Sequence, residues 1–126
     1  MKAFKIDCIN RNITSIIING YKEIIAQIGN ECESFICPII LPNNDVVYAD
    51  YHGYYKTNNN AILHPECTFP IFGNIIIIGV NSKGDLSDVN SEIQTINDVV
   101  SFLSHDFAKK IYNHQILHGS TMFSKN

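Results

Sequence analysis

The feature that most constrains the fold is an unbroken run of four isoleucines, Ile75 to Ile78, with Gly73 and Gly79 close by on either side. β-Branched side chains favour strands. Because successive side chains of a strand point to opposite faces of the sheet, a continuous aliphatic run indicates a strand covered on both faces. The chain has 126 residues, of which 45% are hydrophobic. That is enough for one domain built on such a strand and too little for two.

Shorter patterns predict further strands around this one. Lys2–Ile9 alternates loosely between apolar and polar residues, and Ile13–Ile18 is rich in β-branched residues, so the two are predicted to form a hairpin. Phe35–Leu41 and Val46–Tyr51 are also predicted strands. Because proline cannot donate a ladder hydrogen bond, Pro38 places the first of these two strands at a sheet edge or at a bulge.

Two segments carry the period of a helix. Four apolar residues at positions i, i+3, i+4 and i+7 predict a short helix that ends at Gly29; they are Tyr21, Ile24, Ile25 and Ile28. A second apolar stripe runs from Ile96 to Ile111, after Thr95 and Asp98, which resemble an N-cap and its supporting acid. This second helix is predicted to end at His118–Gly119, and residues 120–126 are predicted to form a flexible tail.

Together these elements define the expected fold. It is a single α+β domain over residues 1–119, with an antiparallel or mixed sheet of five to six strands, one short helix and a longer C-terminal helix. The C-terminal helix is expected to pack on the isoleucine-rich face of the sheet, which makes a core of two layers.

Charge and hydropathy argue against several classes of function. Nine Lys and Arg residues against 12 Asp and Glu give a net charge of -3, which argues against long nucleic acid as a partner because such binding needs a cationic surface. No apolar run approaches the roughly 20 residues that cross a bilayer, so no membrane partner is expected. Met1–Asp7 has the pattern of a strand and lacks the apolar centre of a secretory signal. A cytoplasmic location is therefore expected, with reduced and buried cysteines.

Candidate metal and catalytic motifs are incomplete. A Cys3His zinc site could be drawn from Cys32, Cys37, His64 and Cys67, but the Cys-x4-Cys and His-x2-Cys spacings differ from those of zinc knuckles, so packed thiols are favoured. His114–His118 has the histidine spacing of a zinc-protease helix with glutamine where the general base should be glutamate. We expect no metal and no cofactor, and the sequence favours binding over catalysis.

Several short motifs occur in an order that is informative. Met1–Asp7 is MKAFKID, Gly20–Ile25 is GYKEII, Asp45–Asp50 is DVVYAD and Pro70–Asn74 is PIFGN. Over roughly residues 1–100 this order resembles a family of short phage, prophage and plasmid proteins of unknown function. The resemblance implies a phage context, hence the cytoplasm of the host cell, and it implies no established activity. Where the family often has an acidic pair before a glycine, this chain has Tyr51–His52.

The segment from Tyr48 to Lys56 holds four of the six tyrosines together with a histidine, an acid and a lysine. Aromatic faces stack on bases, and lysine meets phosphates. The leading hypothesis is a non-catalytic phage accessory protein with an anti-defence role, which binds and sequesters a nucleotide-derived signalling molecule. Stacking is expected from Tyr51, Tyr54 and Tyr55, phosphate contacts from Lys56 and Arg11, and base-edge contacts from Asn74. The predicted ligand-binding residues are Arg11, Asp50, Tyr51, His52, Tyr54, Tyr55, Lys56 and Asn74.

Three alternatives stay open. The same tyrosines could be a hot spot through which the protein binds and inhibits a host defence protein or forms a homo-oligomer. A small hydrolase could use Asp50 and His52, which are two apart and would share a strand face, although the sequence does not predict whether the two side chains meet. Finally, the aromatic residues could be structural, since they favour strands and could fill a core that lacks tryptophan.

Overall fold

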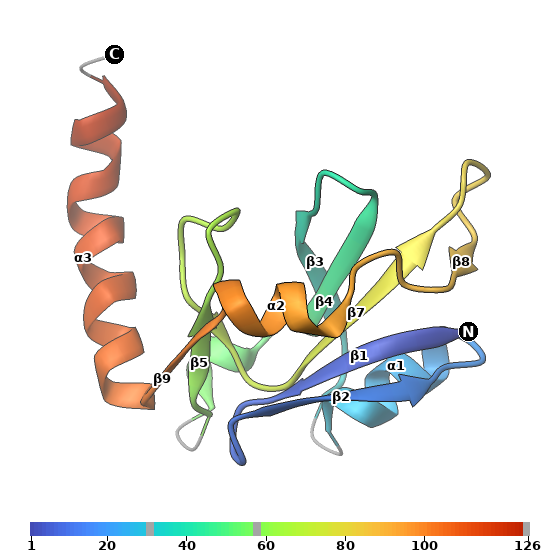
Figure 1. The fold of residues 1–126 in the computed structure, drawn as a ribbon. Helices are drawn as coiled ribbons and strands as arrows, with labels where there is room; N and C mark the ends of the chain where they lie inside the picture. Colours follow the sequence, from blue (N-terminus) through green and yellow to red (C-terminus); the bar gives the residue numbers. More distant parts are fainter. Residues whose placement is uncertain (30–31, 57–58, 125–126) are drawn as a thin grey trace.

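The computed structural model describes residues 1–29, 32–56 and 59–124, and within them the side chains up to Leu117 (Figure 1). Its elements are β1 (Lys2–Asp7), β2 (Asn12–Ile17), α1 (Tyr21–Ile28), β3 (Phe35–Ile40), β4 (Asp45–Asp50), a 3-10 helix η1 (Gly53–Tyr55), β5 (Ala61–Leu63), β6 (Ile71–Phe72), β7 (Ile75–Val80), β8 (Leu86–Ser87), α2 (Ile93–Val99), β9 (Ser101–Leu103) and α3 (His105–Ser124). The predicted α+β class is confirmed, with a 6-stranded sheet, a 3-stranded sheet and helices.

The isoleucine run forms the middle of the larger sheet, as predicted. The strand order is β2-β1-β7-β4-β3, with β8 also pairing with β7, and all pairs are antiparallel. Ile77 stands opposite Phe4 on one neighbour and Val47 on the other. All four isoleucines of the run are at most 1% exposed. The period of two explains this burial, because the sheet is covered on both faces.

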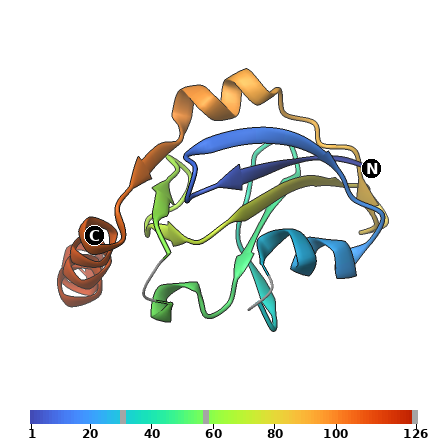
Figure 2. The same cartoon turned by 90° about the horizontal axis from the view of Figure 1, so that it is seen from below.

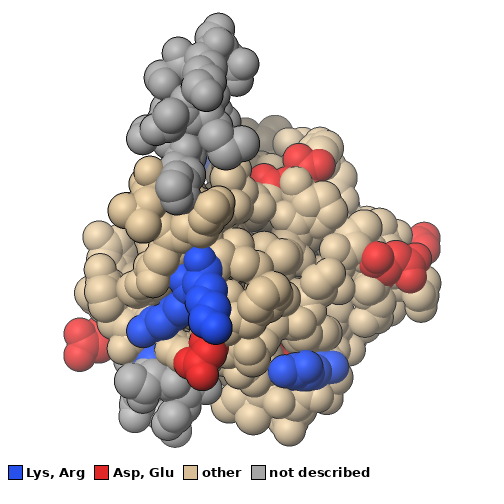
Figure 3. All heavy atoms as spheres, turned by 90° about the vertical axis from the view of Figure 1, so that its left-hand side faces the viewer, with Lys and Arg blue, Asp and Glu red and all other residues tan. Residues whose placement is uncertain are grey.

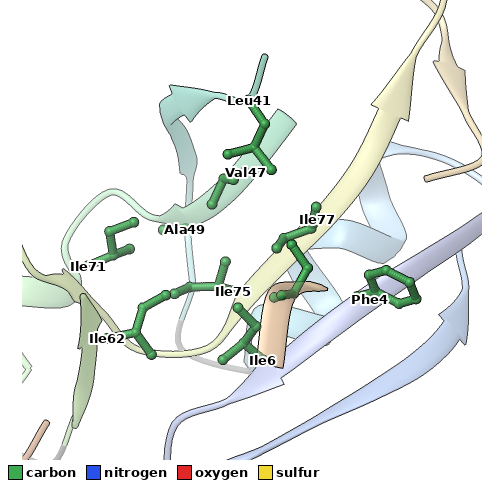
Figure 4. Close-up of a cluster of buried hydrophobic side chains, with 10 residues drawn as sticks. Phe4, Ile6, Leu41, Val47, Ala49, Ile62, Ile71, Ile75 and Ile77 are labelled. Carbon is green, nitrogen blue, oxygen red and sulfur yellow. The ribbon is translucent and has the colours of Figure 1, made fainter. Parts of the chain in front are cut away.

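This strand lies in the middle layer of three, whereas two layers were expected. Ile76 and Ile78 pack with Ile24 and Ile28 of α1 on one face. On the other face, the cluster in Figure 4 joins the remaining two isoleucines to side chains from β1, β4 and the small sheet β6-β5-β9. Ile96 of α2 belongs to the same cluster. Figure 2 shows α1 and α2 on opposite sides of the large sheet.

The predicted longer C-terminal helix is present as α3, but its predicted start at Thr95 is wrong, because the strand β9 separates α2 from α3. The backbone at Val100 is extended, with φ -84 and ψ 133, and β9 then pairs with β5. This pairing satisfies backbone groups that a continuous helix would have satisfied internally. The cap residue of α2 is Glu92 rather than Thr95, and α3 continues to Ser124, past the end predicted at Gly119.

The C-terminal helix α3 packs on the small sheet rather than on the isoleucine-rich face. Ala108 lies in a cluster with Ala61 and Phe72, and His105 Nδ1 lies 2.6 Å from the carbonyl oxygen of Asn59. In Figure 1, α3 stands beside β5 and β9, away from β1 and β2. Of the predicted tail, residues 125–126 lie outside the described residues.

The prediction made from Pro38 is confirmed. β3 is an edge strand, and its pairing with β4 shifts register between Ile36 and Ile39, on either side of Pro38, as the proline predicted. After β4 the chain forms η1, which contains Tyr54 and Tyr55, and then β5.

All four cysteines are unpaired, which agrees with reduced thiols. Cys8 and Cys32 are buried, whereas Cys67 is half-buried and Cys37 is exposed on the edge strand, contrary to the expectation of burial. Burial raises the pKa of the Cys8 thiol above its usual value.

His64, directly after β5, is a buried histidine whose charge state affects stability. It is 8% exposed, and burial lowers its pKa from the usual 6.5, although the nearby Glu66 carboxylate opposes this. The unfolded chain therefore binds a proton here more readily than the folded one. The contribution of His64 to the free energy of unfolding is complete above pH 6.5, the usual pKa. It is lost as the pH falls toward the lower pKa that His64 has in the folded protein.

We therefore expect the free energy of unfolding to fall between pH 7 and pH 5, and this slope to be reduced in His64→Gln. Urea unfolding at a series of pH values measures it. His114→Gln, at an exposed position of α3, is the control and should keep the slope. An unchanged slope in His64→Gln would contradict the assignment.

Candidate functional site

A polar cavity of about 200 Å³ lies where several chain segments meet beside the large sheet. Ile9 comes from the β1–β2 turn, Gly29 from the end of α1, and Asp50 from the end of β4. Lys56 and Asn74 complete its polar wall. The cavity therefore gathers three of the residues predicted from the sequence, from segments up to 24 residues apart.

An ion pair dominates the charge of this polar cavity. The Lys56 ammonium donates to the Asp50 carboxylate, whose side chain is 4% exposed while that of Lys56 is 26% exposed. The other carboxylate oxygen accepts the backbone N–H of His52 at 2.9 Å. The pair fixes the segment from residue 50 to residue 56 and places a cation at the cavity wall.

Asn74 has a structural task that sequence reasoning missed. Its Oδ1 accepts the backbone N–H of Cys8 at 3.1 Å, and its Nδ2 donates to the carbonyl oxygen of Ile28 at 3.3 Å. The side chain thus joins the end of β1 and the end of α1 to the start of β7. An asparagine amide has further donor and acceptor capacity, but its orientation is set by these two bonds.

An aromatic cavity of about 240 Å³ shares Asp50 with the polar cavity as a lining residue. Tyr51 and Tyr54 line it together with Phe72 and with Tyr112 of α3. The Tyr54 ring lies 4.4 Å from that of Tyr112 and 5.4 Å from that of Phe72, between centroids. These are ordinary aromatic packing distances, so the rings form a preformed wall.

α3 also brings polar groups to this aromatic wall. The Tyr54 hydroxyl donates to Asn113 Oδ1 at 2.7 Å, and the Lys109 ammonium lies 5.0 Å from the Tyr54 ring centroid. Figure 3 shows Lys and Arg side chains gathered on this side of the molecule. A cation is thus held over an aromatic ring that lines the cavity.

Comparisons with protein-family models, with curated proteins and with solved structures find no match to this chain. The interpretation of the cavities therefore depends on their own chemistry.

Not all predicted site residues meet. Tyr55 is 75% exposed and lines neither cavity, and its ring packs edge-on against Tyr54 at 5.2 Å. The ring of His52 packs edge-on against Tyr51 at 4.9 Å and also lines neither cavity. Arg11 occupies an exposed turn with φ 54 and is not part of either lining.

Tyr48, at the start of the same segment, is structural. It is 9% exposed, packs edge-on against Phe35 at 4.9 Å between centroids, and faces α1. Burial, with a hydrogen bond to Tyr21, raises the pKa of Tyr48 well above its usual value. The alternative interpretation, that the aromatic residues fill the core, is confirmed for Tyr48.

Lys109 and Tyr112 were missed because α3 was expected to pack elsewhere. A signal was present, because residues three apart share a helix face, so Lys109 and Tyr112 point to the same neighbour.

Within the described residues, no group of three or more His, Cys, Asp or Glu side chains could hold a metal ion, and no helix is long and apolar enough to cross a membrane.

Proposed function

We propose that the protein is a non-catalytic phage accessory protein that binds and sequesters a small nucleotide-derived signalling molecule. The observation that carries the binding part is the adjoining pair of cavities, one aromatic and one polar, with Asp50 in the wall of both. The phage context and an anti-defence role rest on the order of sequence motifs described above.

The two cavities match the two chemical halves of a nucleotide. A base can stack on Tyr51 and Tyr54, because every base offers a π-face to an aromatic ring. Lys56 in the polar cavity, which is paired with Asp50, and Lys109 over the Tyr54 ring supply cations toward which a phosphate can be directed. The buried Asp50 carboxylate can accept from an amino or imino N–H of a base or from a sugar hydroxyl.

The size of each cavity suits a part of a nucleotide. Pockets for drug-sized ligands are typically about 300–1,000 Å³, and the cavities here are about 200 and 240 Å³. Each cavity lies below this range, so each one suits one part of a nucleotide, such as the base or the sugar with its phosphate.

The arrangement of Asp50 and His52 supports binding more than hydrolysis. They are joined through the His52 backbone N–H, while the His52 ring packs against Tyr51. A general base must reach the reacting proton through its side chain, and here the Asp50 carboxylate is already engaged by Lys56. This is an arrangement that holds a ligand-binding loop in place.

A protein partner is the second candidate, and the exposure of two tyrosines favours it. Tyr51 is 60% exposed and Tyr55 is 75% exposed on one short segment. Tyrosines presented in this way are frequent hot spots of interfaces. In this proposal the same segment binds and inhibits a host defence protein or joins copies of the chain into a homo-oligomer.

Native mass spectrometry against cyclic and ADP-ribose-type nucleotides tests the first proposal, and Tyr51→Ala is the informative variant. Because base–aromatic stacking contributes about 1–3 kcal/mol per base, we expect Tyr51→Ala to weaken retention about 5- to 150-fold. Tyr55→Ala is the matched control, because its ring lies on the same segment outside both cavities, and it should bind like the unaltered protein.

The outcomes separate the candidates. Retention without conversion, lost in Tyr51→Ala and kept in Tyr55→Ala, supports sequestration at the paired cavities. Equal losses in both variants, together with capture of a protein in the absence of nucleotide, support the interface. Turnover of a nucleotide that is lost in Asp50→Asn would overturn the non-catalytic assignment.

A further inference from the structure

A third cavity, of about 270 Å³, lies between α2, the turn before β4 and the chain after β5. It shares no lining residue with the polar and aromatic cavities. Its walls are largely apolar, with Leu41 at 6% exposed, Ile96 at 2% exposed and Pro65 facing the same space. Val99 of α2, at 37% exposed, stands at its rim.

Two polar residues in the lining are engaged in holding its walls together. The Ser91 hydroxyl donates to Asp45 Oδ2 at 2.6 Å and accepts from Asn43 Nδ2 at 2.9 Å. Asn43 Oδ1 accepts the backbone N–H of Asp45 at 3.0 Å. These bonds attach the chain before α2 to the turn before β4, so the cavity is built on a fixed frame.

His64 is a buried polar side chain in this lining that keeps a hydrogen-bond donor in reserve. Its Nδ1 accepts the backbone N–H of Glu66 at 3.0 Å, which places the ring proton on Nε2. No protein acceptor for Nε2 occurs among the described residues. Among the described residues, the only fully buried side-chain N or O atom without a partner is Gln115 Oε1, so His64 Nε2 is not sealed, and the His64 side chain lines the third cavity.

We propose that this third cavity is a second ligand site, which takes a small uncharged molecule with an apolar body and one hydrogen-bond acceptor such as a carbonyl oxygen. The acceptor meets His64 Nε2–H, and the apolar body covers Leu41, Pro65 and Ile96. Apolar walls disfavour a charged ligand because its desolvation would be uncompensated, and the Glu66 carboxylate in the lining disfavours anions in particular. At about 270 Å³ the cavity suits a fragment-sized molecule.

The test is an amide NMR titration of the full chain with two probes of similar shape, acetophenone and ethylbenzene. Acetophenone carries a carbonyl acceptor, which ethylbenzene lacks. A hydrogen bond contributes about 0.5–1.5 kcal/mol net, so acetophenone is expected to bind about 2- to 12-fold more tightly. Its shifts should be confined to the amides around residues 41–43, 64–66 and 91–99 and to the His64 Nε2–H signal.

Two variants make the result specific. Val99→Phe fills the rim without altering His64, and it should abolish binding of both probes. His64→Leu removes the donor, and it should bring the two probes to equal affinity. If His64→Leu does not fold, the movement of the His64 Nε2–H signal with acetophenone in the unaltered chain gives the same information.

Several results would overturn this proposal. They are equal affinity for both probes in the unaltered protein, shifts centred on the polar or aromatic cavity, and no shift up to the solubility limit of the probes. Binding that survives Val99→Phe would also overturn it, because it would place the probes elsewhere.

Discussion

Asp45→Ala is expected to lower the free energy of unfolding by about 3–5 kcal/mol. The side chain is fully buried at 0% exposed and accepts three hydrogen bonds, from the backbone N–H groups of Asn90 and Ser91 and from the Ser91 hydroxyl, at 2.6–2.8 Å. Removing the carboxylate leaves these donors without a partner in a buried place, which costs more than the bonds contribute in net terms. Urea unfolding followed by circular dichroism measures the loss.

Graded substitutions distinguish this explanation from general damage. Asp45→Asn keeps an acceptor oxygen and should lose less, and Ser91→Ala removes one of the three bonds and should cost about 1 kcal/mol. Asp98→Ala, at an exposed position of α2, should change stability by no more than about 0.5 kcal/mol. If Asp45→Ala and Asp98→Ala unfold at the same urea concentration, the buried carboxylate does not hold the loop before α2.

Ile77→Ala is expected to destabilise the protein by about 2–5 kcal/mol. Ile77 is 1% exposed, pairs with strands on both sides, and lies in the cluster formed by β1, β4, α2 and the small sheet. Its truncation leaves a cavity that rigid neighbours on several elements cannot close. Since a typical domain is stable by about 5–15 kcal/mol, a large part of the total stability would be lost.

Denaturant unfolding of two matched variants checks this second prediction. Ile77→Val removes one methylene and should cost about 0.5–1.5 kcal/mol. Ile17→Ala, at a position of the edge strand β2 that is 66% exposed, should lie within about 0.5 kcal/mol of the unaltered chain. A loss at Ile17 as large as that at Ile77 would show that β7 is not the dominant core strand.

The parts of the fold that were predictable depend on short-range patterns. The isoleucine run is apolar at every position, which a strand tolerates only when both faces are covered. Pro38 could be assigned to an edge or a bulge because its missing N–H is a property of that residue alone. In both cases, the local chemistry leaves few arrangements open.

The division of the C-terminal helix was not predictable in the same way. The apolar residues from Ile96 to Ile111 have a helical period, but Ser101–Leu103 pairs with a strand about 40 residues earlier. Propensity is a weak prior when a distant partner can satisfy the backbone. The three-layer core follows from that pairing, and a single chain carries no local signal for it.

The candidate site was partly predictable for a similar reason. Asp50, Tyr51 and Lys56 are close in sequence, so their joint presence in one segment suggested a site before any geometry was known. Tyr112 reaches the aromatic cavity only through the placement of α3 on the small sheet. Sequence also could not show that the Asn74 amide is occupied by two backbone partners.

One wall of the aromatic cavity belongs to α3, and this links ligand affinity to a local opening equilibrium. The helix is attached through a small cluster around Ala108 and through side-chain bonds such as Tyr54 to Asn113, so its detachment exposes far less apolar surface than global unfolding. A ligand that packs against Tyr112 binds the attached form alone, and the measured dissociation constant includes the fraction of molecules in that form. Occupancy of the cavity would consequently appear as slower amide hydrogen exchange along α3, at positions that the ligand never touches.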